Sequence, residues 1–375
     1  MNILYISCLS GNPWAGPTYS VPAQITAQSK VDNVFWYDFA DLSNAQIFAN
    51  FQKLNWKNFP FYHGLEEFPH KDISKLPVPF NKPDLIVLEQ LYVHGKLLPL
   101  LRWIKKSKIP YVFIPRGELT HDAQQKKWLK KQLANWLFFY GFAHKASAIE
   151  YLTDQEAKDS GVKWNQKQII IANGITLPPL TVRTYTSNQP LKLVFLGRLD
   201  PYHKGIDLLL QACHMIADSL GEKAVSIDIY GPDRLQKREE MEQMVKSFQL
   251  NNYVRFHDGL YGEQKAIVLK QADVFIMTSR FEGHPMGLIE ALAYGLPCVV
   301  TTGTNMRSEI EKYNAGWTAD NTAESIALAI KKMLSEREQF AQKSQNARKL
   351  AERYDWDRLA QESHEIYKEI LGKRE

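Results

Sequence analysis

Cysteines and long apolar runs are both scarce in this chain. The 375 residues include only three cysteines, Cys8, Cys213 and Cys298, each within an apolar run. An odd and scattered set of this kind indicates reduced core thiols and not a disulfide framework or a zinc site. No stretch of 18 apolar residues occurs, and Met1 leads directly into a predicted strand without a basic leader region. We therefore expect no spanning helix, no signal peptide and a cytoplasmic location.

Two familiar nucleotide-binding motifs are absent or incomplete. No G-x-G-x-x-G follows a predicted strand, which argues against a Rossmann dehydrogenase. Gly11 and Gly16 have the spacing of a P-loop, but Pro17 occupies the position of its lysine. We therefore favour a phosphate site whose positive charge comes from elsewhere over an NTPase loop. The structural alternative is that Gly11 and Pro13 only form a turn.

The charge balance is mild, since 46 Lys and Arg stand against 41 Asp and Glu and give a formal net charge of +5. We expect no nucleic-acid partner. With 45% apolar and 23% charged residues, the composition is that of an ordinary globular protein, and the length suggests two domains.

Short apolar runs separated by helical segments recur along both halves of the chain. Continuous apolar strands of this kind suit a parallel sheet that is covered by helices on both faces. Between the halves, residues 177–192 are rich in Pro, Thr and Ser, which indicates a linker. We predict two doubly wound α/β domains in tandem, with ligands at the carboxyl ends of the strands. We also expect a charged helical surface region within residues 320–349 and a last helix within 356–371. The predicted strands lie within residues 2–8, 33–39, 84–90, 111–116, 146–152, 167–174, 192–198, 225–231, 253–259, 273–279 and 297–303.

The segment "SRFEGHPMGLIEALAYGLP", residues 279–297, carries the densest set of chemical signals. Pro285 suits the first turn of a helix, which would present the N–H groups of Met286 and Gly287 to an anion. Glu290 lies in a stretch that is apolar on nearly all sides, so we expect a buried carboxylate that needs partners. A structural Arg or Lys is one suitable partner, and a pair of sugar hydroxyls is the other.

The same segment resembles the signature of the retaining glycosyltransferases of family 4, in which two glutamates, here Glu282 and Glu290, enclose seven residues. The segments "FLGRLDPYHKG", "IYGPD", "VRFHDGL", "IANGI" and "YDWDRLAQ" are also similar to this family. The resemblance implies the GT-B architecture, with two Rossmann-like domains that face each other across a cleft. Residues 1–178 would bind the acceptor and residues 188–354 the nucleotide sugar, and residues 355–375 would cross back to the N-terminal domain as a helix.

The resemblance also implies roles for individual residues. Glu290 would hold the ribose of the nucleotide, and Glu282 the hydroxyls of the donor sugar. Arg198 and Lys204 would hold the diphosphate and stabilise it as a leaving group, so that the loop of the first domain needs no lysine of its own. The reaction would retain the anomeric configuration, and no metal or other cofactor is expected. Further expected donor contacts are Gly16, Gly231, Gly259, Leu260, Gly283, His284, Met286 and Gly287.

One short motif points to a different chemistry. Asp355-Trp356-Asp357 has the D-x-D form that binds a metal-bridged nucleotide in another glycosyltransferase architecture. It precedes a predicted amphipathic helix, so we interpret Asp355 or Asp357 as an N-cap or a first-turn acid.

The acceptor side is expected in the first domain, around "FIPRGELTHD". Many members of the family have a histidine after this strand, whereas this chain has Arg116 and, further on, His121. These two residues are therefore the candidate catalytic contacts of the first domain. The Pro-Arg-Gly-Glu-Leu segment resembles enzymes of bacterial surface polysaccharide assembly, which implies a lipid-linked saccharide as acceptor. A soluble saccharide is the alternative.

A lysine-rich helix is predicted directly after this segment. Basic helices with exposed aromatics can lie on an anionic membrane surface, which would place the protein peripherally on the inner face of the plasma membrane. The alternative is that the apolar stripe faces the sheet and that the lysines are an ordinary solvated face. The stripe consists of Leu129, Leu133, Trp136, Leu137 and Tyr140, and the lysines are Lys126, Lys127, Lys130 and Lys131.

Two other functions stay open. A nucleotide-sugar epimerase would share the two-domain architecture, and a catalytically silent nucleotide-sugar binder would share the binding residues. The presence of all four residues Arg198, Lys204, Glu282 and Glu290 favours an active transferase over the silent binder.

Overall fold

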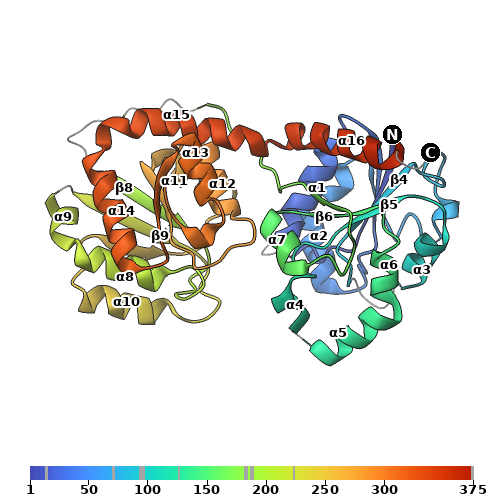
Figure 1. Ribbon diagram of the computed structural model, residues 1–375, viewed down its shortest axis with the longest axis horizontal. Helices are drawn as coiled ribbons and strands as arrows, with labels where there is room; N and C mark the ends of the chain where they lie inside the picture. The colour runs from blue at the N-terminus through green and yellow to red at the C-terminus, as the bar shows by residue number, and fades with distance from the viewer. Residues whose placement is uncertain are drawn as a thin grey trace. The chain divides into compact units, whose positions relative to one another are not determined.

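The computed structural model describes residues 1–12, 16–69, 72–92, 98–125, 127–180, 185, 190–222 and 224–372. The chain divides into two compact units (Figure 1). The first comprises Met1–Gly174 together with Trp356–Glu375, and the second comprises Ile175–Asp355. Each unit is built around one parallel β-sheet.

The sheet of the first unit has seven strands in the order β3-β2-β1-β4-β5-β6-β7. In its centre, Ile3 of β1 is aligned with Val34 of β2 on one side and with Leu85 of β4 on the other. The central strands are apolar on both faces because helices cover both of them. The strands are β1 (Asn2–Ser7), β2 (Asn33–Asp38), β3 (Tyr62–Gly64), β4 (Leu85–Glu89), β5 (Tyr111–Ile114), β6 (Ala148–Tyr151) and β7 (Gln168–Ile170).

The last helix of the chain packs on the first helix of the first unit. Val21 and Ile25 share one core cluster with Leu359 and Tyr367. The chain enters this helix beside Gly174, where a Cβ atom would lie only 2.4 Å from the Trp356 ring. The helices are α1 (Pro17–Gln28), α2 (Ala45–Leu54), α3 (Leu98–Lys106), α4 (His121–Gln125), α5 (Trp128–Ala134), the π-helical turn η4 (Asn135–Phe139), α6 (Tyr140–Ala143), α7 (Asp154–Ser160) and α16 (Trp356–Gly372).

The second unit repeats the same plan with six strands in the order β10-β9-β8-β11-β12-β13. In both sheets the strand order reverses at one point, between β1 and β4 and between β8 and β11, which is where doubly wound folds bind ligands. The strands are β8 (Leu191–Leu196), β9 (Val225–Tyr230), β10 (Val254–His257), β11 (Val274–Met277), β12 (Cys298–Thr301) and β13 (Gly316–Ala319). The helices are α8 (Ile206–Met215), α9 (Ala217–Glu222), α10 (Arg238–Ser247), α11 (Gly262–Gln271), α12 (Met286–Ala293), α13 (Arg307–Tyr313), α14 (Ala323–Ser335) and α15 (Phe340–Ala351).

The prediction of two Rossmann-like α/β domains with a returning C-terminal helix is confirmed. All eleven predicted strands are present, while the short strands β3 and β13 were not predicted. The expected surface region 320–349 is helical, but Ile326, Ile330 and Met333 of α14 lie in the core of the second unit. The helix expected across residues 126–140 is present from Trp128 onward, where α5, η4 and α6 follow one another without a break. Lys127, with a φ of 57°, precedes it and separates it from α4.

Several smaller predictions concern single residues. No disulfide joins the three cysteines, all of which the structure describes; Cys213 and Cys298 are buried and Cys8 is half-buried. Asp357 is a first-turn acid of α16, and its carboxylate lies 2.6 Å from Lys30 Nζ, as expected for a structural D-x-D. In the part of the chain that the structure describes, no helix is long and apolar enough to cross a membrane.

Candidate functional site

In the second unit, glycines allow the strand ends to approach one another at the point where the strand order reverses. A Cβ atom on Gly205, which has a φ of 61°, would lie 1.9 Å from the Thr278 carbonyl oxygen. A Cβ atom on Gly231 would lie 1.7 Å from the carbonyl oxygen of Gly197. The loops after β8, β9 and β11 can therefore pack this closely only with glycine at these positions.

The predicted cation Lys204 and the predicted acid Glu282 form an ion pair in these loops. Lys204 Nζ lies 2.5 Å from Glu282 Oε1, and the Ser279 hydroxyl donates to the same oxygen. The lysine side chain is 12% exposed and the glutamate 10%. The Thr278 hydroxyl donates to the carbonyl oxygen of Gly205 at 2.9 Å, which fixes the backbone next to Lys204. The structure thus brings together two residues that are 78 positions apart.

Arg198 lies on the exposed side of the same loop. Its Nη2 atom lies 3.1 Å from Nδ1 of His203, whose ring stacks on Phe281 with centroids 4.3 Å apart. Burial and the neighbouring Lys204 lower the pKa of His203, so its neutral ring can accept a hydrogen bond from the guanidinium. His203 is a positioning contact that sequence reasoning missed, although it stands within the "PYHKG" stretch.

Glu290 has a lysine partner that no motif indicated. Lys265 Nζ of α11 lies 2.7 Å from both carboxylate oxygens of Glu290 in α12. The Glu290 side chain is 24% exposed, so the prediction of a buried carboxylate is wrong. Its neighbours on α12 are buried, but this one position emerges beside α11. Of the two partners considered from the sequence, the structural lysine is present.

The start of α12 uses its backbone differently from the prediction. Pro285 is the N-cap and the helix begins at Met286. The Met286 N–H donates to the His284 carbonyl oxygen at 3.0 Å, so this donor is satisfied locally. A Cβ atom on Gly287 would lie 3.2 Å from the Leu196 carbonyl oxygen, which brings the helix start close to the end of β8.

His284 is the one histidine of this segment, and it is kept neutral. Burial lowers its pKa to about 4. Its Nδ1 atom lies 3.3 Å from Met286 Sδ, and Nε2 has no hydrogen-bond partner among the described residues. The other predicted donor contacts differ in exposure: Gly283 is exposed, whereas Gly259 and Leu260, in the loop after β10, are half-buried.

In the first unit, Gly16 directly precedes α1 and is exposed. The N–H groups of Tyr19 and Ser20 donate to its carbonyl oxygen, each at 3.1 Å. The hydroxyl of Thr18, which has the position of a P-loop hydroxyl, donates instead to the carbonyl oxygen of Asn12 at 2.6 Å. Pro13 lies outside the described residues.

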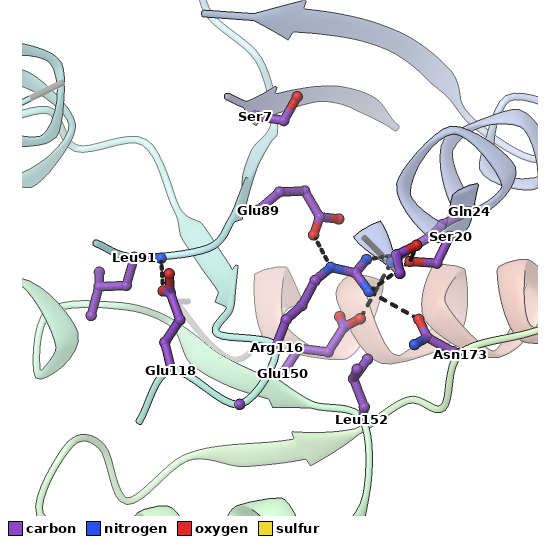
Figure 2. Close-up of polar contacts among 12 residues, drawn as sticks. Ser7, Ser20, Gln24, Glu89, Leu91, Arg116, Glu118, Glu150, Leu152 and Asn173 are labelled. Atoms are coloured by element: carbon purple, nitrogen blue, oxygen red, sulfur yellow. Dashed lines mark hydrogen bonds and ion pairs between the residues drawn. The ribbon is translucent and has the colours of Figure 1, made fainter. Parts of the chain in front are cut away.

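Arg116 occupies the centre of a buried polar network, which Figure 2 shows. Its side chain is only 4% exposed, and Nε lies 2.6 Å from Glu89 Oε2 at the end of β4. Nη1 donates to Asn173 at 2.9 Å and to Ser20 at 3.2 Å, and Nη2 donates to Gln24 at 2.8 Å. The guanidinium therefore joins β4, α1 and the segment after β7, and sequence reasoning found none of these partners.

A second carboxyl, Glu150 of β6, completes this network. It accepts a hydrogen bond from the Tyr367 hydroxyl of α16 at 2.6 Å and one from Gln24 at 3.4 Å. Burial raises the pKa of Glu150 to about 8. Glu89 Oε1 is also buried and has no hydrogen-bond partner among the described residues.

The two residues after Arg116 hold neighbouring loops. Gly117 has a φ of 85°, and its N–H donates to the Glu156 carboxylate of α7. The Glu118 carboxylate accepts the N–H groups of Leu91 and Tyr92, which follow β4. His121 is exposed at the start of α4, and no described contact joins it to Arg116.

Four of the five residues of the predicted stripe are exposed, so the alternative that this stripe faces the sheet is wrong for most of it. The fifth, Tyr140, packs inward with its ring 4.7 Å from that of Trp164, and Phe139 of η4 is also buried. We call the exposed set the α5 surface: Trp128 is 50% exposed, Leu129 74%, Leu133 59%, Trp136 76% and Leu137 65%.

The four lysines next to the α5 surface are not equivalent. Lys127 and Lys130 are exposed. Lys131 Nζ donates to the Ala123 carbonyl oxygen at 2.6 Å and lies 5.0 Å from the centre of the Tyr92 ring. Lys126 lies outside the described residues.

No metal site is evident in the ranges that the structure describes, since no group of three His, Cys, Asp or Glu side chains is placed to hold an ion.

Comparison with known proteins finds a family that part of the second unit resembles. Residues 183–350 match the family described as "Glycosyl transferases group 1". An uncharacterized glycosyltransferase of Methanocaldococcus jannaschii, MJ1607, is 30% identical over 189 residues, which is 48% of this chain and 46% of that protein. The putative colanic acid biosynthesis glycosyltransferase WcaL of Salmonella typhimurium is 24% identical over 44% of this chain and 41% of its own length. The chain thus spans less than half of the length of these two relatives.

A longer match and two solved structures extend the likeness to both units. An uncharacterized glycosyltransferase of Haemophilus influenzae is 24% identical over 81% of this chain and 87% of its own length. Anabaena Alr3699/HepE in complex with UDP has a TM-score of 0.71 at 17% identity, covering 98% of this chain and 100% of that chain. Sucrose-phosphate synthase from Thermosynechococcus elongatus has a TM-score of 0.70 at 15% identity over the full length of both chains. At such identities the two structures show the fold alone, which is GT-B.

Proposed function

We propose that the protein is a glycosyltransferase that transfers a sugar from a nucleoside diphosphate sugar to a hydroxyl of an acceptor, because residues 183–350 match the family described as glycosyl transferases group 1. The observation that carries the proposal is the ion pair of Lys204 and Glu282 at the point where the strand order of the second sheet reverses. This is the position at which a doubly wound fold binds a nucleotide.

The chemistry of these side chains fits a diphosphate leaving group and a sugar. Breaking the bond between sugar and phosphate leaves negative charge on the diphosphate, which Lys204 and the exposed Arg198 would stabilise without a metal ion. Glu282 would accept hydroxyls of the donor sugar, and Glu290 those of the ribose, because one carboxylate can accept two O–H bonds. We further propose that the anomeric configuration is retained.

In the first unit, the geometry supports a change in the role of Arg116. Each of its three guanidinium nitrogens donates to a protein group, and the side chain is 4% exposed. It is therefore better suited to hold α1 and its preceding Gly16 in place than to touch a substrate. His121, which is exposed, stays the candidate contact to the acceptor, and Gly16 a candidate contact to the donor.

The proposed acceptor is a lipid-linked saccharide of bacterial surface polysaccharide assembly. Two observations support it. A relative of this chain carries the name of a colanic acid biosynthesis enzyme. The α5 surface exposes two tryptophans and three leucines next to Lys127 and Lys130, a combination that suits an anionic membrane.

Binding of nucleoside diphosphates tests the proposed function. In a thermal-shift panel, one of the uridine, guanosine, adenosine and thymidine diphosphates should stabilise the protein by about 2.7 kcal/mol at 100 times its Kd. Slow hydrolysis of the corresponding sugar donor without acceptor would then separate an enzyme from a silent binder. The absence of any shift across the panel would contradict the proposal.

A further inference from the structure

The contact between Lys265 and Glu290 differs from the other ion pair of the site in its symmetry. Lys265 Nζ lies 2.7 Å from Oε1 and 2.7 Å from Oε2, so it holds both oxygens of the Glu290 carboxylate. Lys204, in contrast, meets Glu282 at Oε1, which also accepts the Ser279 hydroxyl. A lysine placed between two oxygens fixes the rotation of the carboxylate plane.

This arrangement leaves acceptor capacity for a ligand. A carboxylate offers about four lone-pair sites, and the Lys265 ammonium donates a hydrogen bond to Oε1 and forms an ion pair with Oε2. At least one further site stays on each oxygen, which is the number that a pair of neighbouring hydroxyls needs. The Glu290 side chain is 24% exposed and that of Lys265 31%, so solvent and ligands can reach the pair.

Both side chains are on helices, which hold the contact between Lys265 and Glu290 in a fixed position. Lys265 is in the first turn of α11, and Glu290 is in the middle of α12, where Ile289 and Ala291 on either side are fully buried. Without its lysine, the glutamate side chain would have to lose its rotamer freedom at the moment when a ligand binds.

We propose that Lys265 is a positioning residue that presets the Glu290 carboxylate for a vicinal diol, and that it thereby sets the preference for ribose over sugars without these hydroxyls. The inference rests on the proposed function, because it takes the ribose of the nucleoside diphosphate as the ligand of Glu290. Lys265 itself acts through the glutamate and need not touch the nucleotide.

The test measures binding of matched nucleotides by calorimetry. The wild type is first titrated with uridine, guanosine, adenosine and thymidine diphosphates. The tightest of the uridine, guanosine and adenosine diphosphates is then compared with its 2′,3′-dideoxy analogue on Lys265→Met, Lys265→Arg and Glu290→Gln, because thymidine diphosphate lacks the 2′-hydroxyl. Lys270→Met serves as a control, since Lys270 is an exposed lysine of the same helix. Thermal melting of each variant without ligand reports on folding.

We expect Lys265→Met to weaken binding of the nucleotide with both hydroxyls by about threefold to tenfold and to leave binding of the dideoxy analogue unchanged. Lys265→Arg should recover part of the loss, because a guanidinium can hold both carboxylate oxygens. Lys270→Met should behave as wild type. In the Glu290→Gln background, Lys265→Met should not further change the ratio of the affinity for the nucleotide with both hydroxyls to that for its dideoxy analogue.

Two results would overturn the inference separately from the proposed function. If the wild type binds a diphosphate but Lys265→Met has the same ratio of affinities for the nucleotide with both hydroxyls and for its dideoxy analogue, Lys265 does not position Glu290. If Lys265→Met binds the nucleotide with both hydroxyls more tightly than the wild type does, the lysine competes with the ribose for Glu290 and does not position the carboxylate. If the wild type binds none of the four diphosphates, the proposed function itself is wrong and the inference falls with it.

Discussion

The polar network of the first unit and the ion pairs of the second unit both pair a basic side chain with a glutamate, but at different depths. Arg116 and Glu89 are 4% and 0% exposed, whereas Lys265 and Glu290 are 31% and 24% exposed. A buried pair is costly to break and meets no ligand, while a half-exposed pair exchanges partners with water or a ligand at little cost. The difference separates residues that hold a fold from residues that can bind a substrate.

Removal of the buried Arg116 guanidinium should have the largest effect and tests whether the buried network stabilises the first unit. Arg116→Ala leaves the buried Glu89 carboxylate without its cation, and we expect a loss of about 3–5 kcal/mol in the free energy of unfolding. Chemical denaturation would measure it. The double variant Arg116→Met with Glu89→Gln, which removes both charges, should lose clearly less. A loss below about 1 kcal/mol in the single variant would show that the network does not hold the first unit together.

A comparable effect on activity, without one on folding, is expected in the second unit. Lys204→Ala should lower turnover by roughly 10²–10³, the range for removal of one preorganised stabiliser of transition-state charge. Activity of the wild type should persist in a chelator. Steady-state kinetics with a donor sugar would measure both. Inactivation by the chelator and rescue by manganese would instead favour a metal-bridged diphosphate.

The protonated carboxyl of the network provides a pH test of intermediate size. Burial, with Glu89 nearby, raises the pKa of Glu150 to about 8, against a partial lowering by Tyr367 and Arg116. The unfolded chain releases this proton near the ordinary value of 4.5. The folded state therefore holds more protons between these values, and its stability should fall as the pH rises from about 4.5 to 8. Glu150→Gln should make this part of the profile flatter, and an unchanged slope would contradict the assignment.

The smallest effect is expected at the α5 surface. Each exposed lysine near an anionic surface contributes about 1 kcal/mol, so Lys127→Gln with Lys130→Gln should weaken binding to anionic vesicles by roughly 30-fold at low salt. Flotation would measure it, with nucleotide binding as the control for folding. Leu129→Ser with Trp136→Ser should release the protein as well. A wild type that does not float would shift the acceptor toward a soluble saccharide.

The strands were predictable where they lie in apolar runs of the sequence. The predicted β7 contains three residues and β12 four, as few as the missed strands β3 and β13. The missed strands differ in composition, because "YHG" and "GWTA" each contain a glycine and a polar residue and so show no apolar run. Helical periodicity likewise showed that α5 has an apolar stripe, but periodicity states only that residues share a face. Whether that face is covered depends on tertiary packing.

The candidate site was predictable only where a motif fixes its residues. Lys204 and Glu282 follow strand ends of a recognisable pattern, and the fold brings them within 2.5 Å of each other. Lys265 and Glu89 belong to no motif, and their partners are 25 and 27 positions away along the chain. Contacts of this kind arise from the packing of separate elements, so sequence spacing carries no signal for them.

The central claim is that the ion pairs Lys204–Glu282 and Lys265–Glu290 form the donor site, and the two glutamates test it most directly. Calorimetric titration with the tightest-binding nucleoside diphosphate should give a clearly weakened affinity for Glu290→Ala, which loses the ribose contact. Glu282→Ala should bind the same diphosphate as the wild type does, while it loses turnover of the sugar donor. Equal diphosphate affinity in the wild type and in Glu290→Ala would contradict the claim.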